Sequence, residues 1–343
     1  MTEKKTATIR DIARQAAVSC STVSRALKGN ETISTATRER IRKIAKKLDY
    51  LPNQAAQMLI ERKRGAHMDA ALISIIYESG ISLNDNYFSM LIKSIVDESS
   101  RDGFATAIYA LVNTYDGVLS LSRLLKSRFT AGFVLVGNID DRLIPLLAKN
   151  CPNIVVVDKP SRSFTSVTND NERGAYEAVS YLLRSGARRV GLIHGAANHY
   201  FTLPMQSGYR RALADAGIPF DPLLCVEGEF HIASGYGAMK TLLTRRAPPD
   251  GIFSNDEMAV GAMKALKEAG RTIPGEVTVF GFDNIVLSEI VEPSLSTVKV
   301  EYEFMARTAV RKLIENSGKD HLVPVNITIP VELILRESTR RGS

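Results

Sequence analysis

The polar side chains with the clearest chemical use fall in two separate parts of the chain. Near the N-terminus, the segment STVSRAL contains Arg25, whose forked guanidinium donors can pair with O6 and N7 of a guanine base. Far along the chain, Asn255 and Asp283 follow apolar runs, where their side chains could hydrogen-bond the hydroxyls of a small molecule. These residues indicate a nucleic-acid contact and a separate ligand site.

The motifs of common catalytic folds are missing from the sequence. It holds no Gly-x-Gly-x-x-Gly after the first apolar run, no P-loop and no Gly-x-Ser-x-Gly elbow. Its five histidines lack the spacing of metal ligands. Cys20, Cys151 and Cys225 are too few and too far apart for a disulfide framework or a zinc site. We therefore expect a protein that is not an enzyme and needs no metal or other cofactor.

Charge is distributed unevenly along the 343 residues. Residues 1–64 hold 15 Lys and Arg against 6 Asp and Glu, a net charge of +9, whereas residues 65–343 carry a net charge of −2. A basic module on a near-neutral body favours a nucleic-acid partner over a solubilising tail. The sequence shows neither a signal peptide nor an apolar run of the roughly 18 residues that a membrane helix needs, so we expect a cytoplasmic protein.

Three short helices are expected in the basic module. Thr8 and Asp11 form an N-cap and its acidic partner, ahead of apolar residues on one helical face. Ser19 can cap a second helix, and a third begins at Ser34 or Thr35. Two helices across a tight turn, braced by a third, are typical of a helix-turn-helix, in which the second helix enters the major groove of DNA.

The order of residues in this module is specific. The stretch TIRDIARQAAVSCSTVSRALKGNETISTATRERIRKIAKKLDYLPNQAAQML closely resembles the start of the lactose-repressor/galactose-repressor (LacI/GalR) family of bacterial transcription regulators. The resemblance implies that Cys20, Ser21 and Arg25 face base edges, with the alternative that Cys20 only packs within the module. It also implies phosphate contacts, which position a helix without reading sequence, from Ser19, Thr22 and Ser24.

A linker follows at residues 52–70. Its first part has good helix formers but is too short to form a helix that is stable alone in water. In the resembling family this segment folds on DNA, which implies that Asn53, Ala56 and Leu59 reach the minor groove, with Leu59 as a wedge. The alternative is that Leu59 and Ile60 pack on the body of the protein.

The body, residues 71–343, alternates apolar strand-like runs with amphipathic helical stretches. Buried apolar strands separated by helices predict parallel α/β sheets, and two sets of them predict two lobes. Such sheets bind ligands at the carboxyl ends of their strands. The predicted fold class is therefore an all-α helix-turn-helix headpiece, residues 1–51, joined to a two-lobed α/β domain that binds an effector and dimerises.

The resemblance continues through the body. The segments SGARRVGLIHG, SGYRRAL, IFSNDEMAVGAMKAL and TVFGFDN are similar to the periplasmic-binding-protein-like core of these regulators. Asp170 is either a ligand contact or a structural cap. Between Gly195 and Gly208 the family commonly supplies an arginine that grips the effector, and here none is present. Either His199 or Tyr200 substitutes, or the effector lacks an anionic group. The expected effector-binding set is Tyr87, Phe88, Asp158, Phe230, Asn255 and Asp283.

These expectations combine into a transcription regulator, by default a repressor of a carbohydrate-utilisation operon. Its effector is expected to be a sugar or sugar derivative; a nucleobase or nucleoside, or a partner-protein corepressor, remain alternatives. A secreted solute-binding protein would carry an export signal in place of a headpiece. We expect a homodimer on a palindromic operator, because one recognition helix reads only a few base pairs.

We predict that Leu59→Ala weakens operator binding far more than non-specific DNA binding. A leucine wedged into a central base step kinks the duplex, and a flexible pyrimidine–purine step makes the kink less costly. Titrations on operator and random DNA, with gel-shift phasing for the bend, measure both effects. Equal loss on the two DNAs, or an unchanged bend, would show that Leu59 only packs on the body.

Overall fold

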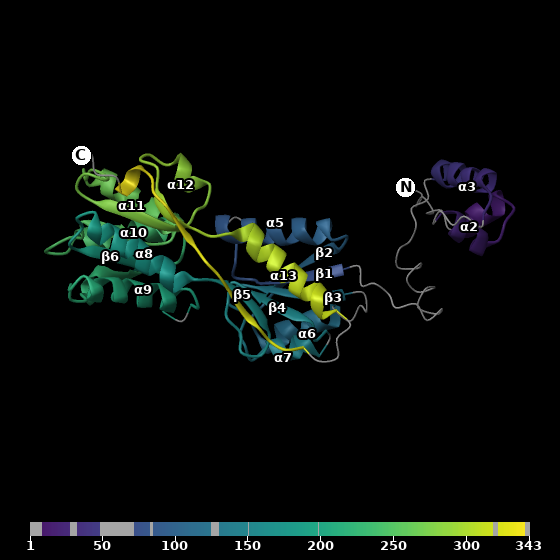
Figure 1. The fold of residues 1–343 in the computed structure, drawn as a ribbon, viewed down its shortest axis with the longest axis horizontal. Helices are drawn as coiled ribbons and strands as arrows, with labels where there is room; N and C mark the ends of the chain where they lie inside the picture. Colours follow the sequence, from purple (N-terminus) through teal and green to yellow (C-terminus); the bar gives the residue numbers. More distant parts are fainter. Residues whose placement is uncertain are drawn as a thin grey trace. The chain divides into compact units, whose positions relative to one another are not determined.

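The chain forms two compact units, Met1–Asp69 and Ala70–Ser343. The linker residues Asn53, Ala56 and Leu59 lie outside the described residues, so their expected role stays a prediction. Within the described part, no helix is long and apolar enough to cross a membrane. This computed structural model (Figure 1) describes residues 9–27, 33–48, 72–82, 85–124, 130–149, 151–197, 199–317 and 322–339.

Three helices pack around a small core in the N-terminal unit, namely α1 (Ile9–Gln15), α2 (Cys20–Leu27) and α3 (Thr35–Lys47). Each helix contributes fully buried side chains, among them Ile12, Val23 and Ile41. Ser19 caps α2 as expected, because its hydroxyl accepts a hydrogen bond from the backbone N–H of Thr22 at 3.1 Å. The predicted three-helix headpiece is confirmed over these residues.

The first lobe of the larger unit is built on a parallel six-stranded sheet with the order β11-β5-β4-β3-β1-β2. Helices α5 and α13 cover one face, and α6 and α7 cover the other (Figure 1). The strands are β1 (Leu72–Glu78), β2 (Ala105–Leu111), β3 (Thr130–Val136), β4 (Ile154–Val157), β5 (Thr165–Asn169) and β11 (Asn326–Ile329). The helices are α5 (Asn86–Arg101), α6 (Tyr115–Leu124), α7 (Ile144–Ala148) and α13 (Tyr302–Asn316).

The second lobe has a sheet of order β12-β10-β9-β8-β6-β7, in which only the edge strand β12 runs antiparallel to its neighbour among the described pairs. The helix pair α8 and α9 and the helix pair α10 and α11 pack on this sheet. The strands are β6 (Val190–His194), β7 (Cys225–Glu227), β8 (Gly251–Phe253), β9 (Thr278–Asp283), β10 (Ser296–Lys299) and β12 (Glu332–Ile334). The helices are α8 (Asn171–Arg184), α9 (Thr202–Asp215), α10 (Ile232–Leu243), α11 (Asp256–Glu268), α12 (Leu287–Ile290) and the short 3₁₀ turns η1 (Pro222–Leu224) and η2 (Glu337–Thr339).

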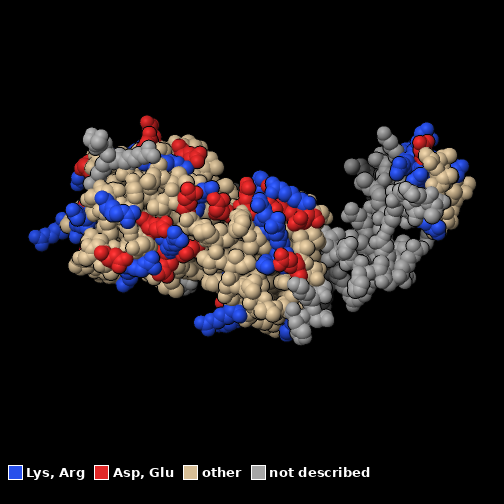
Figure 2. Space-filling model, in the orientation of Figure 1, with Lys and Arg blue, Asp and Glu red and all other residues tan. Residues whose placement is uncertain are grey.

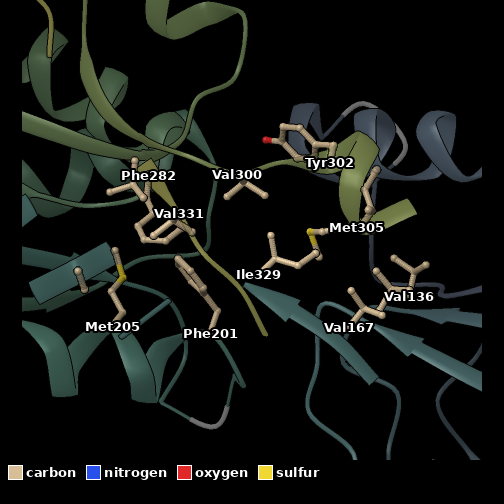
Figure 3. Close-up of a cluster of buried hydrophobic side chains, with 14 of the residues drawn as sticks. Val136, Val167, Phe201, Met205, Phe282, Val300, Tyr302, Met305, Ile329 and Val331 are labelled. Atoms are coloured by element: carbon tan, nitrogen blue, oxygen red, sulfur yellow. The ribbon is translucent and has the colours of Figure 1, made fainter. Parts of the chain in front are cut away.

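The chain passes between the two lobes three times, after β5, after β10 and after β11. Apolar side chains from both lobes meet around these crossings, including Phe201, Phe282, Val300, Ile329 and Val331 (Figure 3). The two predicted lobes are confirmed. Strands β5 and β7 and the strands after β9 were not predicted from the sequence, so the crossings after β10 and after β11 were not predicted either.

Helices α10 and α11 pack with their backbones in close contact. A Cβ atom at Gly235 would lie 2.2 Å from the carbonyl oxygen of Met258, and a Cβ atom at Gly261 would lie 2.0 Å from that of Ile232. No side chain fits at either distance, so both positions require glycine for the helices to approach this closely.

We predict that Gly235→Ala lowers the free energy of unfolding by about 1–3 kcal/mol, since the added methyl must push α11 away. Gly237→Ala is the matched control: a Cβ atom there meets nothing within 4 Å, and alanine is a better helix former. Urea unfolding of the two variants beside the parent protein measures the difference. If the two substitutions changed stability equally, the close packing at Gly235 would be of no energetic importance.

A second prediction concerns pH and the buried carboxyl of Asp256. Its oxygens accept hydrogen bonds from the hydroxyl of Thr297 at 2.6 Å and from the backbone N–H of Ile285 at 2.9 Å. Burial nevertheless raises its pKa from 3.8 to about 7. Between these two values the folded protein holds a proton that the unfolded chain has released, so stability is lost as the pH rises from about 4 to 7.

Asp256→Asn removes this dependence, because the amide carries no charge and Thr297 can reverse its hydrogen bond. The melting temperature of the variant, relative to the parent protein, should therefore rise between pH 4.5 and pH 8. A constant difference across that range would show that Asp256 titrates normally in the folded protein.

Candidate functional site

A cavity of about 550 Å³ lies between the two lobes, at the carboxyl ends of strands from both sheets. Glu78 and Asn169 reach it from the ends of β1 and β5, and Asp283 reaches it from the end of β9. All six residues expected to bind an effector line this one cavity, namely Tyr87, Phe88, Asp158, Phe230, Asn255 and Asp283.

Asp158 follows β4 at a positive φ of 70°. Its carboxylate accepts a hydrogen bond from the hydroxyl of Tyr200, which belongs to the second lobe. Burial raises the pKa of Asp158 to about 7, while hydrogen bonds from Tyr200 and Tyr87 act in the opposite direction. Near neutral pH this carboxyl can therefore either donate or accept a hydrogen bond.

Two further polar groups enter from the second lobe. Asp283 is buried at the end of β9, and burial, reinforced by the neighbouring carboxylates of Asp256 and Asp85, raises its pKa well above the usual range. Asn255 is the N-cap of α11, and its Oδ1 accepts from the backbone N–H of Met258 at 3.2 Å. The Nδ2 of Asn255 is the group that remains to donate to a ligand.

Aromatic rings form part of the cavity wall. The ring of Phe230 lies 4.7 Å from that of His199, between centroids, and a Cβ atom at Gly195 would lie 1.8 Å from the Phe230 ring. Glycine at 195 thus makes room for this ring. Tyr87 and Phe88 pack edge to face at 5.1 Å. Apolar rings beside hydrogen-bonding groups suit a molecule that has an apolar face and polar edges.

Between Gly195 and Gly208, the arginine that the resemblance led us to look for is absent. This segment supplies His199 and Tyr200 to the cavity wall. Tyr200 bonds to Asp158 across the lobes, as described above. Burial, together with the nearby charge of Lys159, lowers the pKa of His199 to about 4, so its ring is neutral at pH 7. Neither residue therefore brings a positive charge to the cavity in place of the arginine.

Sequence reasoning missed two features of this region. Asn169 borders the cavity only because the unexpected strand β5 ends there. Between the lobes, Nδ2 of Asn86 donates to Oε1 of Glu257 at 2.7 Å. Of the alternatives left open for Asp170, the structure shows the structural cap: its carboxylate accepts from the backbone N–H of Arg173 at 3.2 Å, at the start of α8.

In the N-terminal unit, three side chains of α2 that were expected to contact DNA bases face solvent. Cys20, Ser21 and Arg25 are exposed, whereas Val23 and Ala26 are fully buried. The exposed thiol of Cys20 shows that the alternative in which it packs within the core is wrong. Three side chains that were expected to face base edges are therefore free of the core.

The hydroxyls at the start of α2 form a small cluster. Ser19 Oγ lies 2.8 Å from the hydroxyl oxygens of both Ser21 and Thr22. The side chain of Ser24 is outside the described part of the structure. On the face of the larger unit shown in Figure 2, Lys and Arg are interspersed with Asp and Glu, so no single-sign patch dominates that face.

Two family profiles match this chain. Residues 8–53 match the bacterial regulatory proteins of the lacI family, and residues 179–339 match a periplasmic binding protein-like domain. The first match spans the three helices of the N-terminal unit, and the second spans most of the second lobe.

Whole-chain comparisons agree with these matches. The solved lac repressor dimer bound to operator and the anti-inducer ONPF has a TM-score of 0.85 and 25% identity, over 98% of this chain and 99% of that chain. The transcriptional regulator CelR in its cellobiose complex has a TM-score of 0.72 and 27% identity, over 97% and 99%. The probable HTH-type transcriptional repressor ExuR of Bacillus subtilis (strain 168) is 32% identical over 344 residues, 97% of this chain and 98% of the relative. Because this likeness runs through both units, the chain belongs to the LacI family of bacterial regulatory proteins.

Proposed function

We propose that this protein is a sequence-specific DNA-binding repressor of a carbohydrate-utilisation operon, controlled by a sugar or sugar derivative in the inter-lobe cavity. The observation that carries the proposal is the cavity, where six ligand-competent side chains meet at the strand ends of both lobes. We infer that the protein is not an enzyme, works in the cytoplasm and binds a palindromic operator as a homodimer. The relative ExuR, named a probable repressor, supports the direction of control.

In this proposal α2 lies in the major groove of the operator. Arg25 reads guanine with both of its terminal donors, and Cys20 and Ser21 contact neighbouring base edges. Phosphate contacts, which fix the register of the helix, come from Ser19, Thr22 and Ser24. The exposure of Cys20, Ser21 and Arg25 supports this assignment because none of them is needed for the core.

The effector site is proposed to be the inter-lobe cavity. Carboxyl and amide groups of Asp158, Asn255 and Asp283 would hold hydroxyls, and the Phe230 ring would cover an apolar face of the ligand. The relative CelR, solved as a cellobiose complex, supports a sugar. A cavity of about 550 Å³ favours a small molecule over a partner-protein corepressor, and a nucleoside is the second candidate.

The switch is proposed to act through the arrangement of the lobes. A ligand shifts that arrangement only if it binds one form better than the other. The hydrogen bonds between lobes, from Tyr200 to Asp158 and from Asn86 to Glu257, would differ between the two forms. The linker residues Asn53, Ala56 and Leu59 would fold in the minor groove when the protein binds its operator.

The experiment that tests the DNA-binding role is Arg25→Ala. Losing a bidentate guanine contact should cost about 1–3 kcal/mol per half-site, while non-specific attraction to phosphates remains. Fluorescence anisotropy on a selected operator and on random DNA gives the ratio of affinities. The exposed Arg42 of α3 provides the control, since Arg42→Ala should weaken binding to operator and to random DNA by the same factor. An Arg25→Ala protein that discriminates as well as the parent would remove Arg25 as the base reader.

The effector role is tested by Asp283→Ala. The variant should lose affinity for the effector and its response to it, yet bind operator in the absence of effector, because the carboxylate lies in the cavity and not on α2. Asp170→Ala is the control: it removes a helix cap outside the cavity lining and should lower stability while keeping the response. Normal effector affinity in Asp283→Ala would refute the assignment.

A further inference from the structure

The cavity has an unusual charge balance. Six carboxyl groups line it, and none of the described lining residues is a lysine or an arginine. The nearby Lys159 is engaged elsewhere, since its Nζ donates to the carbonyl oxygen of Ile139 at 2.7 Å and lies 3.1 Å from Oδ1 of Asp141. An anion in this cavity would therefore face six carboxyl groups without a lysine or arginine among the described lining residues to pair with it. The carboxyl groups come from Glu78, Asp85, Asp158, Glu229, Glu257 and Asp283.

Asn169 is a second, independent observation. This side chain borders the cavity at the end of β5 and is 5% exposed. Neither its Nδ2 nor its Oδ1 has a hydrogen-bond partner among the described residues. A buried amide without partners destabilises a protein, so its presence beside a ligand-sized cavity indicates that a bound molecule supplies the missing partners.

We propose that the effector is a neutral polyhydroxy compound without a carboxylate or phosphate group, and that Asn169 is a specificity-determining residue that hydrogen-bonds it. This inference rests on the proposed function, because it names the ligand class of the same cavity. Asn169 is outside the set of residues that the sequence analysis expected to bind an effector.

Hydroxyl groups match the hydrogen-bonding capacity of this cavity. Each hydroxyl both donates and accepts, as does the amide of Asn169 and as does a carboxyl near its pKa, such as that of Asp158. A carboxylate or phosphate only accepts, and in a water-poor site its repulsion by nearby carboxylates is weakly screened. The face of the Phe230 ring can cover the C–H groups of such a compound.

The ligand class can be tested with matched probes. Titration calorimetry of the full-length protein would use D-glucose, D-galactose, D-ribose and cellobiose, together with glucuronate, galacturonate, glucose 6-phosphate, ribose 5-phosphate and glucosamine. At least one neutral sugar should bind, and its anionic counterpart should bind at least about 100-fold more weakly.

Three outcomes would overturn the proposal that the effector is a neutral polyhydroxy compound. In the first, an anionic probe binds as tightly as its neutral parent. In the second, glucosamine binds more tightly than glucose, which would show that the site prefers a cationic ligand. In the third, no neutral sugar binds at millimolar concentration. Operator binding, measured in the same samples, separates the hypotheses: specific DNA binding with any of these outcomes leaves the repressor role standing, whereas its absence removes the proposed function itself.

The role of Asn169 is tested by Asn169→Leu beside Asn153→Leu. The amide of Asn153 donates to the carbonyl oxygens of Ala131 and Leu313, at 2.9 and 2.8 Å, away from the cavity. Asn169→Leu should lower the affinity for the neutral sugar about tenfold or more. Its melting temperature should be unchanged or raised, because the substitution removes an unpaired polar group. Asn153→Leu should lower the melting temperature and leave sugar affinity unchanged.

The opposite pattern would overturn the assignment of Asn169. An Asn169→Leu protein that melts at a lower temperature and binds the sugar normally would show that this amide has a structural role. Asn169→Asp adds a second readout, since it keeps the acceptor oxygen and replaces the donating NH2 group with a second carboxylate oxygen. This variant should bind the sugar more weakly than the parent protein does, and more weakly still as the pH rises.

Discussion

The constraint on which the rest of this structure depends is the triple crossing of the chain between the two lobes. At the crossings, Ile329 and Val331 pack with Val300 and Phe282 in one apolar cluster that continues into both lobes. Separating the lobes there would expose buried apolar surface, so this side of the molecule holds together. Relative movement of the lobes is least costly about the crossings. The strand ends of the two sheets face each other across the cavity, where such movement has its effect.

The contacts across the cavity are of a different kind. The hydrogen bonds from Asn86 to Glu257 and from Tyr200 to Asp158 are polar, and water or a ligand can replace such bonds at a small net cost. The apolar side therefore fixes how the lobes are joined, and the polar side decides how far they close. A ligand that exchanges hydrogen bonds on the polar side can shift the balance without disturbing the core.

The cavity also concentrates features that work against stability. Three of its lining residues, Asp158, Phe230 and Asp283, have positive φ, a region in which side chains other than glycine are strained. Burial of carboxyl groups at Asp158 and Asp283 adds a further cost. Surrounding packing, such as the space that Gly195 leaves for the Phe230 ring, holds these residues in place. Strained backbone and buried carboxyl groups in one location are typical of a site shaped for binding.

This contrast explains how much of the molecule the sequence could predict. Helix α2 was expected to begin directly after its cap Ser19, as it does in the structure, because its apolar periodicity is local and strong. The sequence indicated Asp158, Asn255 and Asp283, which line the cavity, for the same reason, since each follows or closely follows an apolar run. Strand β5 reads TSVTN, which carries little apolar signal of its own.

Strand β5 lies between β4 and β11, and on the β11 side Ser166 donates to Asn326, a residue 160 positions away. No local pattern contains that contact, so the strand was missed, and Asn169 at its end was missed with it. The same argument applies to the crossings, because the lobe to which a segment belongs depends on distant partners. The sequence therefore reveals the site residues that follow locally encoded strands, whereas the residues that complete the cavity depend on how distant segments pair.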